Sequence, residues 1–105
     1  MKRAIELIAD ERKRQIEVKG FTIEQDDVYY DSGDLALAGA CYALGTCAGS
    51  FEDKNSSLYK HWPFGEVWWK PTPNNRIREL IKAGALIVAE IERLQRFEQN
   101  KTLEK

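Results

Sequence analysis

The sequence predicts an all-α protein, a small helical bundle with three main helices joined by a long Trp-rich connector. Residues 2–19, 34–49 and 76–97 each read as a helix, and the first and last carry apolar residues three and four positions apart. No segment shows a convincing strand pattern. At 105 residues the chain is expected to form a single helical domain, residues 1–105.

The first predicted helix places three polar residues among its apolar ones. At about 100° per residue, Glu11, Arg12 and Gln15 fall on the arc that carries the Ile and Leu residues. A buried charge is costly unless it is paired. These three groups therefore either satisfy one another or a helix terminus, or they line a site. We expect the helix to end at Gly20.

The second predicted helix is apolar nearly all round, so it should lie in a core or at a subunit interface. Ser32 or Asp31 is expected to cap it, with Asp34 in its first turn, where the helix dipole favours an anion. A three-helix core of this size is thin. We therefore expect a homo-oligomer.

Composition excludes several classes of protein. A net charge of −1 provides no broad basic field, so duplex nucleic acid is not an expected partner. The N-terminus lacks the apolar region of a secretory signal, and the longest apolar run is too short to span a bilayer, so no membrane partner is expected. We expect a cytoplasmic protein in which Cys41 and Cys47 are reduced, small core residues.

The connector at residues 49–75 holds all the Trp residues, and a connection this long is usually functional or flexible. The strings SLYKHW and GEVWW are candidates for a short fourth helix. Trp68 and Trp69 stand near Lys70 and Arg76, and aromatic faces stack on nucleobases while cations and a helix N-terminus hold phosphate. Trp-rich loops also fill cores, and that alternative stays open. Because the two Trp residues are adjacent, at least one should be partly exposed.

A ligand site built from these segments would combine the following residues: Glu11, Arg12, Gln15, Trp68, Trp69, Lys70 and Arg76. In this reading the Trp side chains stack on a base, the Lys and Arg side chains hold phosphate, and Gln15 and Glu11 read polar groups.

Acidic residues suggest a second kind of site. Glu90 falls on the inward arc of the last helix, as Glu11 does in the first, and an acidic connector lies between the first two helices. Oxygen-rich clusters of this type suit Mg²⁺, with Glu11, Asp27, Asp34 and Glu90 as candidate ligands. The alternative is a solvated acidic connector, with Glu11 or Glu90 paired to Arg12 or to a Trp N–H.

Several strings along most of the chain resemble a family of small phage and prophage proteins. They are ERKRQ, KGFT, EQDD, GDLALAGACYA, WPFGEVWWKP and LIKAGALIVAEIERL. The resemblance implies the cytoplasm of a bacterial host as the location. Phage proteins of this size often sequester the nucleotide messengers of bacterial defence, and the resemblance implies such an anti-defence role here.

More distantly, the layout resembles the MazG-like all-α NTP pyrophosphatases. Those helical oligomers bind Mg²⁺ through paired E-x-x-E and E-x-x-D motifs. The GDLALA string is similar to the start of the second motif, with Asp34 in place of its Glu. Leu37 and Ala38 occupy the region of the partner Asp, and the chain contains no E-x-x-E string.

Three hypotheses follow. The first is a phage-type protein that binds a nucleotide or a nucleotide-derived defence signal without turnover. The second is a Mg²⁺-dependent nucleoside triphosphate pyrophosphohydrolase. The third is a protein–protein inhibitor module anchored by the Trp-rich connector.

Overall fold

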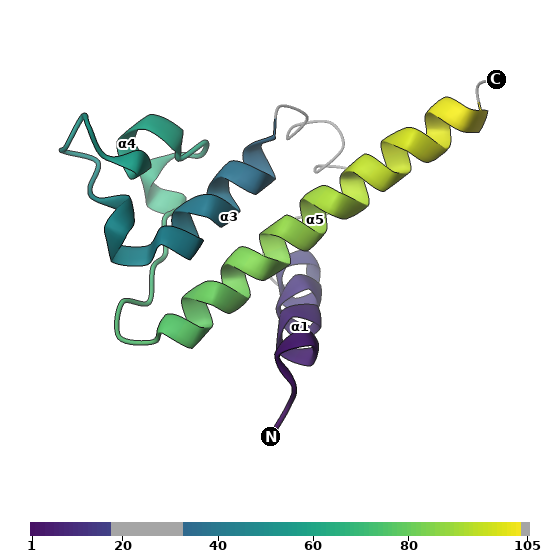
Figure 1. The fold of residues 1–105 in the computed structure, drawn as a ribbon, viewed down its shortest axis with the longest axis horizontal. Coiled ribbons are helices and arrows are strands. Elements are labelled where there is room, and N and C mark those ends of the chain that lie inside the picture. The colour runs from purple at the N-terminus through teal and green to yellow at the C-terminus, as the bar shows by residue number, and fades with distance from the viewer. Residues whose placement is uncertain (18–32, 104–105) are drawn as a thin grey trace.

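In a computed structural model, which describes residues 1–17 and 33–103, all regular structure is helical. The α-helices are α1 (Ala4–Glu17), α3 (Asp34–Leu44), α4 (Ser57–His61) and α5 (Arg76–Leu103). Two 3₁₀ turns, η1 (Gly45–Ala48) and η2 (Glu66–Trp68), lie in the chain between α3 and α5 (Figure 1). The predicted all-α class is confirmed for this part of the chain.

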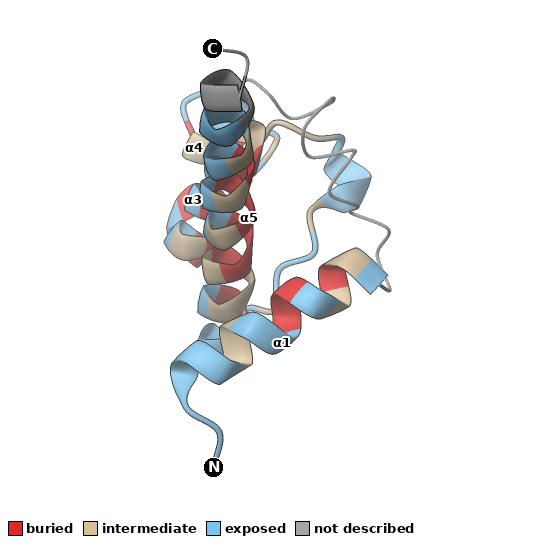
Figure 2. Cartoon of the chain, turned by 90° about the vertical axis from the view of Figure 1, so that its right-hand side faces the viewer, coloured by how far each residue is buried: buried red, intermediate tan, exposed pale blue. Residues whose placement is uncertain are grey.

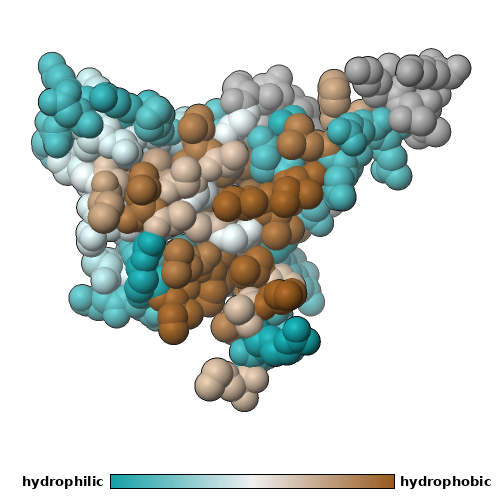
Figure 3. All heavy atoms as spheres, viewed as in Figure 1, coloured by the Kyte–Doolittle hydropathy of each residue, from teal (hydrophilic) through white to brown (hydrophobic). Residues whose placement is uncertain are grey.

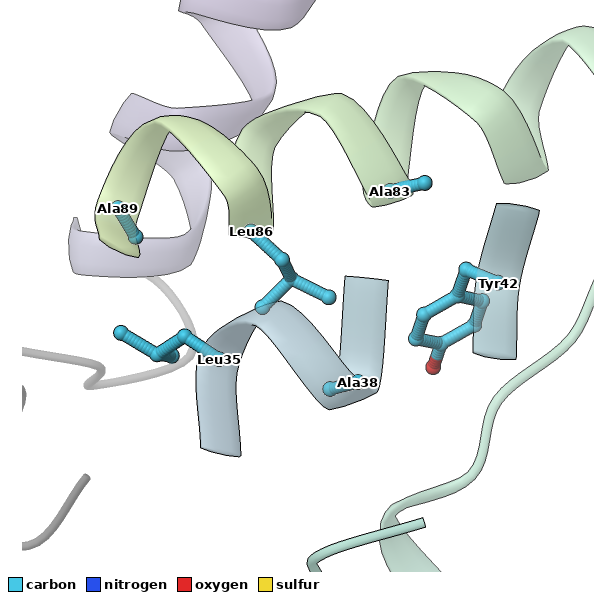
Figure 4. Close-up of a cluster of buried hydrophobic side chains, with 6 residues drawn as sticks. All are labelled: Leu35, Ala38, Tyr42, Ala83, Leu86 and Ala89. Atoms are coloured by element: carbon cyan, nitrogen blue, oxygen red, sulfur yellow. The ribbon is translucent and has the colours of Figure 1, made fainter. Parts of the chain in front are cut away.

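Helix α5 organises the fold because it packs against both α3 and α1 (Figure 1). The core between α3 and α5 consists of small and medium apolar side chains that point toward one another: Leu35, Ala38, Tyr42, Ala83, Leu86 and Ala89 (Figure 4). Gly39 permits this close approach, since a Cβ atom there would lie 3.2 Å from the carbonyl oxygen of Ala83. A larger residue at this position would separate the two helices.

A second small core lies on the other side of α3. Cys41, Ala48 and Leu58 are buried together, and Trp62 and Trp69 pack against them. Helix α4, which supplies Leu58, begins at a serine cap: the backbone N–H of Tyr59 donates to Oγ of Ser56 at 3.1 Å. The cap hydroxyl donates in turn to the carbonyl of Ser50 at 2.7 Å. The connector therefore folds back on α3.

Helix α1 meets α5 at a second glycine. A Cβ atom at Gly84 would lie only 2.8 Å from Cδ1 of Ile8. Glycine thus lets α1 approach α5 closely. Figure 2 shows buried positions between α3 and α5, and again on the second half of α1.

The boundaries of two helices differ from prediction. The second predicted helix stops as an α-helix at Leu44, because Gly45 takes a φ of +62° and the chain continues as the turn η1. The last helix continues past the predicted end at Phe97 to Leu103. Its final turns contain Glu, Gln, Lys and Leu, which favour helix, and no Gly or Pro to stop it.

The predicted caps also need correction. The N-cap of α3 is Gly33, with a φ of 83° and no side-chain cap, rather than Ser32 or Asp31, which lie outside the described residues. Asp34 occupies the first turn as predicted. The predicted end of the first helix at Gly20 lies outside the described residues.

Of the predictions about the connector and the two cysteines, one is confirmed and one is wrong in part. Both connector strings form short helical pieces, α4 and η2, as anticipated. Cys41 is buried, but Cys47 is exposed, because the break at Gly45 ends the helical phase that relates the two residues. Among the described residues, no helix is long and apolar enough to cross a membrane.

The α3–α5 core yields a stability prediction. Leu35 is 2% exposed, so Leu35→Ala should lower the free energy of unfolding by about 2–5 kcal/mol, through lost transfer energy and a cavity. Val67, in η2, is 69% exposed, and Val67→Ala should change it by less than about 0.5 kcal/mol. Urea denaturation followed by circular dichroism measures both. Equal effects of the two substitutions would contradict this core.

Candidate functional site

The three polar residues singled out in the first helix are the buried residues of α1. Glu11, Arg12 and Gln15 are 2%, 7% and 5% exposed. Their predicted inward orientation is confirmed. The question is then what each group contacts on α5.

Glu11 is the centre of a charged cluster between α1 and α5. Its carboxylate accepts from Nε and Nη2 of Arg14 at 2.8 and 2.9 Å, and from Nη2 of Arg78, on α5, at 2.6 Å. The side-chain amide of Gln15 donates to the same carboxylate at 3.3 Å. Two guanidinium groups share one carboxylate, so these three charged groups carry an excess of one positive charge.

The cluster keeps Glu11 ionised. Burial raises the pKa of the Glu11 carboxyl, but hydrogen bonds from Arg14 and Arg78, together with their charges, outweigh burial and leave the pKa below its ordinary value of 4.5. The same bond to Glu11 raises the pKa of the Arg14 guanidinium, against a smaller opposing effect of burial. Both partners therefore stay charged at neutral pH.

Arg12 extends the polar contact further along α5. Its Nε donates to Glu92 at 3.0 Å, and the Arg12 side chain is buried while that of Glu92 remains half exposed. Arg78 and Glu92, four helical turns apart, hold α1 across the face of α5. Gln15 pairs with Glu11, as one of the two predicted alternatives required, whereas Glu11 and Arg12 are paired mainly with side chains outside the predicted trio.

Two predicted residues, Trp69 and Lys70, lie near α5 one turn beyond Arg78, at Lys82. Lys82 donates from Nζ to the carbonyl of Lys70 at 2.8 Å and stands 5.6 Å above the ring of Tyr42. The ring of Trp69 lies 4.6 Å from that of Tyr42, between ring centroids. Arg78 and Lys82 are four residues apart and therefore neighbours on one face of α5. This face joins the Glu11 cluster to the aromatic connector.

The pKa of the Tyr42 hydroxyl reflects the same closeness of the Glu11 cluster to the connector. Burial raises the pKa of its hydroxyl, the backbone N–H of Lys70 opposes this by donating to it at 3.0 Å, and the charges of Glu11 and Glu79 raise it further. The hydroxyl therefore stays protonated at neutral pH.

Trp68 and Arg76 occupy different surroundings. Trp68 is 56% exposed, which confirms that one of the two adjacent Trp side chains faces outward, while Trp69 is half-buried. Arg76 donates from Nη1 to the carbonyl of Tyr42 at 3.0 Å and also bonds the carbonyl of Ala43. It thus caps the C-terminus of α3, where a cation is favourable.

The four candidate metal ligands are not gathered in the described structure. Glu11 is held by Arg14 and Arg78, and Glu90, buried as predicted, accepts from Nε of Arg93 at 2.5 Å. Asp34 begins α3, and Asp27 lies outside the described residues. Within residues 1–17 and 33–103, no three His, Cys, Asp or Glu side chains come close enough to share a metal ion.

Sequence reasoning did not predict the contacts that Arg14, Arg78 and Glu79 make. Arg14 falls on the charged outer arc of the first helix, yet its long side chain folds back to Glu11. Arg78 reaches Glu11 because α1 crosses α5 at this point, which the sequence of α5 does not show. Glu79, 2% exposed, accepts from Nη1 of Arg76 and from the backbone N–H of Thr72, both at 3.3 Å. The signal available in the sequence was the position of Glu79 in the first turn of the last helix, where the helix dipole favours an anion.

Comparisons with known proteins gave no identification. No protein-family model, no curated protein and no solved structure matches this chain.

The Glu11 cluster predicts a pH dependence. A carboxylate whose pKa is lower in the folded than in the unfolded state stabilises the fold above its unfolded pKa, and this contribution is lost as the pH falls through the folded value. Glu11→Gln should therefore lower the free energy of unfolding by about 1–3 kcal/mol at pH 7. The difference from wild type should shrink below pH 4.5, the ordinary value for a carboxyl.

Urea denaturation at pH 7, 5 and 3 measures this difference. Glu6→Gln, an exposed acid in the first turn of the same helix, is the matched control and should show little effect at any pH. A Glu11→Gln penalty that stays constant from pH 7 to pH 3 would contradict the assignment.

Proposed function

We propose that this protein binds a nucleotide or a nucleotide-derived anion on the face of α5 that carries Arg78 and Lys82, and holds it without turnover. The observation that carries the proposal is the excess of guanidinium charge around Glu11. The side chains of Arg14 and Arg78 are 37% and 31% exposed, so they retain surface for a further anion. Arginine is suited to phosphate because its planar fork donates two parallel hydrogen bonds.

The aromatic side of the face supports a base-containing ligand. Trp69, Tyr42 and Lys82 are in contact next to Arg78, and Trp68 adds an exposed ring in the same connector. Stacking on such rings tolerates any base. Gln15, which is buried, contributes by donating to the Glu11 carboxylate. In this proposal Lys70 contributes charge beside Trp69, the Arg12–Glu92 pair holds α1 against α5, and Arg76 fixes the connector to α3.

The resemblance to phage and prophage proteins supplies the biological role that we propose. A protein that sequesters a nucleotide messenger of bacterial defence needs tight binding and no chemistry. We propose that it works in the host cytoplasm as a homo-oligomer. The alternatives to this role are a Mg²⁺-dependent pyrophosphohydrolase that uses Glu11, Asp27, Asp34 and Glu90, and an inhibitor of a host protein.

Lys82→Met tests the cationic part of the face. It removes a charge but keeps an apolar stem, so the affinity for nucleotide should fall by about 10–100-fold, the effect of losing one charge-assisted hydrogen bond. Isothermal titration with nucleoside triphosphates and cyclic dinucleotides, with and without Mg²⁺, measures the affinity. Chromatography of each mixture shows whether the nucleotide is recovered intact. Pyrophosphate formed only with Mg²⁺ would favour the hydrolase instead.

Lys13→Met is the matched control, because Lys13 is exposed on α1 and contributes the same charge to the chain. Its affinity should equal that of wild type. An equal loss of affinity in both variants would mean that only the overall charge of the protein matters. If the wild-type protein bound no nucleotide, the proposal would be overturned.

Trp68→Ala tests the stacking part. Loss of one stacked ring should weaken nucleotide binding by about 1–3 kcal/mol, and the quenching of Trp fluorescence by ligand should diminish. Tyr59→Ala, which removes an exposed ring from α4, is the control and should bind like wild type. Unchanged affinity in Trp68→Ala would remove this side chain from the site.

A further inference from the structure

Helix α5 carries an apolar stripe that α1 and α3 touch only locally, with Ile8 over Gly84 and Gly39 beside Ile87. Five large side chains on it are 43–69% exposed: Ile77, Leu80, Ile87, Ile91 and Leu94. A monomer rarely leaves so many large apolar side chains together in water. Figure 3 shows hydrophobic side chains gathered along α5 on the viewed face.

The spacing of the stripe is that of a helix packed lengthwise against another helix. The five residues, with Gly84, recur at alternating intervals of three and four positions, the a and d positions of a heptad repeat. A single short crossing would need only a few of them. The regular repeat extends from Ile77 to Leu94 and therefore calls for a partner helix of similar length.

Length identifies the partner. Helix α5 has 28 residues, or about 42 Å, whereas α1 has 14 residues and α3 has 11. Helices α1 and α3 are both shorter than the stripe from Ile77 to Leu94, so within the described structure the helix long enough to cover all of it is α5 itself.

Charge permits two copies to face each other. The flanking positions on one side are Ile81, Val88 and Gln95, so no charged side chain interrupts the a, d and e positions from Ile77 to Gln95. Two such faces can meet in either orientation without like-charge contacts. The charged clusters of α5 lie elsewhere, at Arg78 toward Glu11 and at Glu90 beside Arg93.

The face continues onto α1. Ile8 fills the space above Gly84, and Ile5, one turn earlier, is 72% exposed. These neighbours extend the apolar surface beyond α5, toward the area of about 600–1,000 Å² per partner that stable interfaces bury.

We propose that the protein forms a symmetric dimer through this stripe, with α5 of one copy packed along α5 of the other. The inference rests on the self-association proposed above and not on nucleotide binding. A twofold axis would bring the same residues of both copies together along the stripe, with Ile8 at its edge above Gly84. The Arg78 and Lys82 face would remain outside the contact on both copies.

Ile91→Glu tests the interface, because it places a charge in the middle of an apolar contact without disturbing a buried residue. Sedimentation equilibrium over a range of concentrations should show a wild-type dimer and a dissociation constant raised by about 30-fold or more in the variant. Val67→Glu, at an exposed apolar site in η2 away from the stripe, should dimerise like wild type. Circular dichroism checks that each variant is folded, and Leu94→Lys provides a second disruption if Ile91→Glu is not.

Each outcome decides the proposal. A monomeric Ile91→Glu or Leu94→Lys beside dimeric wild type and Val67→Glu supports it. A dimer that persists in both stripe variants overturns this interface and leaves self-association through another face. A wild type that is monomeric at all concentrations overturns both. Nucleotide titration of Ile91→Glu should match wild type, so a failure of ligand binding is separable from a failure of the interface.

Discussion

The structure depends on one long helix, α5, whose surface has to present three different contact faces at once. Helix α5 offers one face to α3, a second to α1 and a third that the described chain leaves open. Each face has its own chemistry: small apolar residues toward α3, ionised groups toward α1, and branched apolar residues on the open side. Because the three faces lie on one rigid rod, a change of register on one would displace the others.

The two covered faces are held by different forces. Against α3, close approach at Gly39 buries alanine and leucine side chains, and the gain is hydrophobic. Against α1, a core of ordinary apolar residues is replaced by the Glu11 carboxylate and its guanidinium partners. A buried ion pair is weak evidence for stability, since apolar residues of similar volume often serve as well. Its use here agrees with the anion site that we propose for this face.

The open face offers a reason why α5 continues well past the ends of α1 and α3 (Figure 1). A helix of this length is poorly supported by two shorter ones, and its apolar stripe would be unfavourable in water. Pairing with a second copy would bury the stripe and leave the charged face accessible. The proposed ligand site and the proposed dimer contact therefore use different residues of one helix.

The sequence by itself determined the all-α class, the start of α5 at Arg76 and the inward orientation of Glu11, Arg12, Gln15 and Glu90. Helical periodicity fixes these features locally, because the direction of a side chain follows from its position along the helix. Tertiary structure alone decided which groups meet. Arg14 turns back to Glu11, Arg78 reaches it from 67 residues away, and Arg76 caps α3. These contacts depend on where α1 and α3 cross α5, which no pattern within a single helix records.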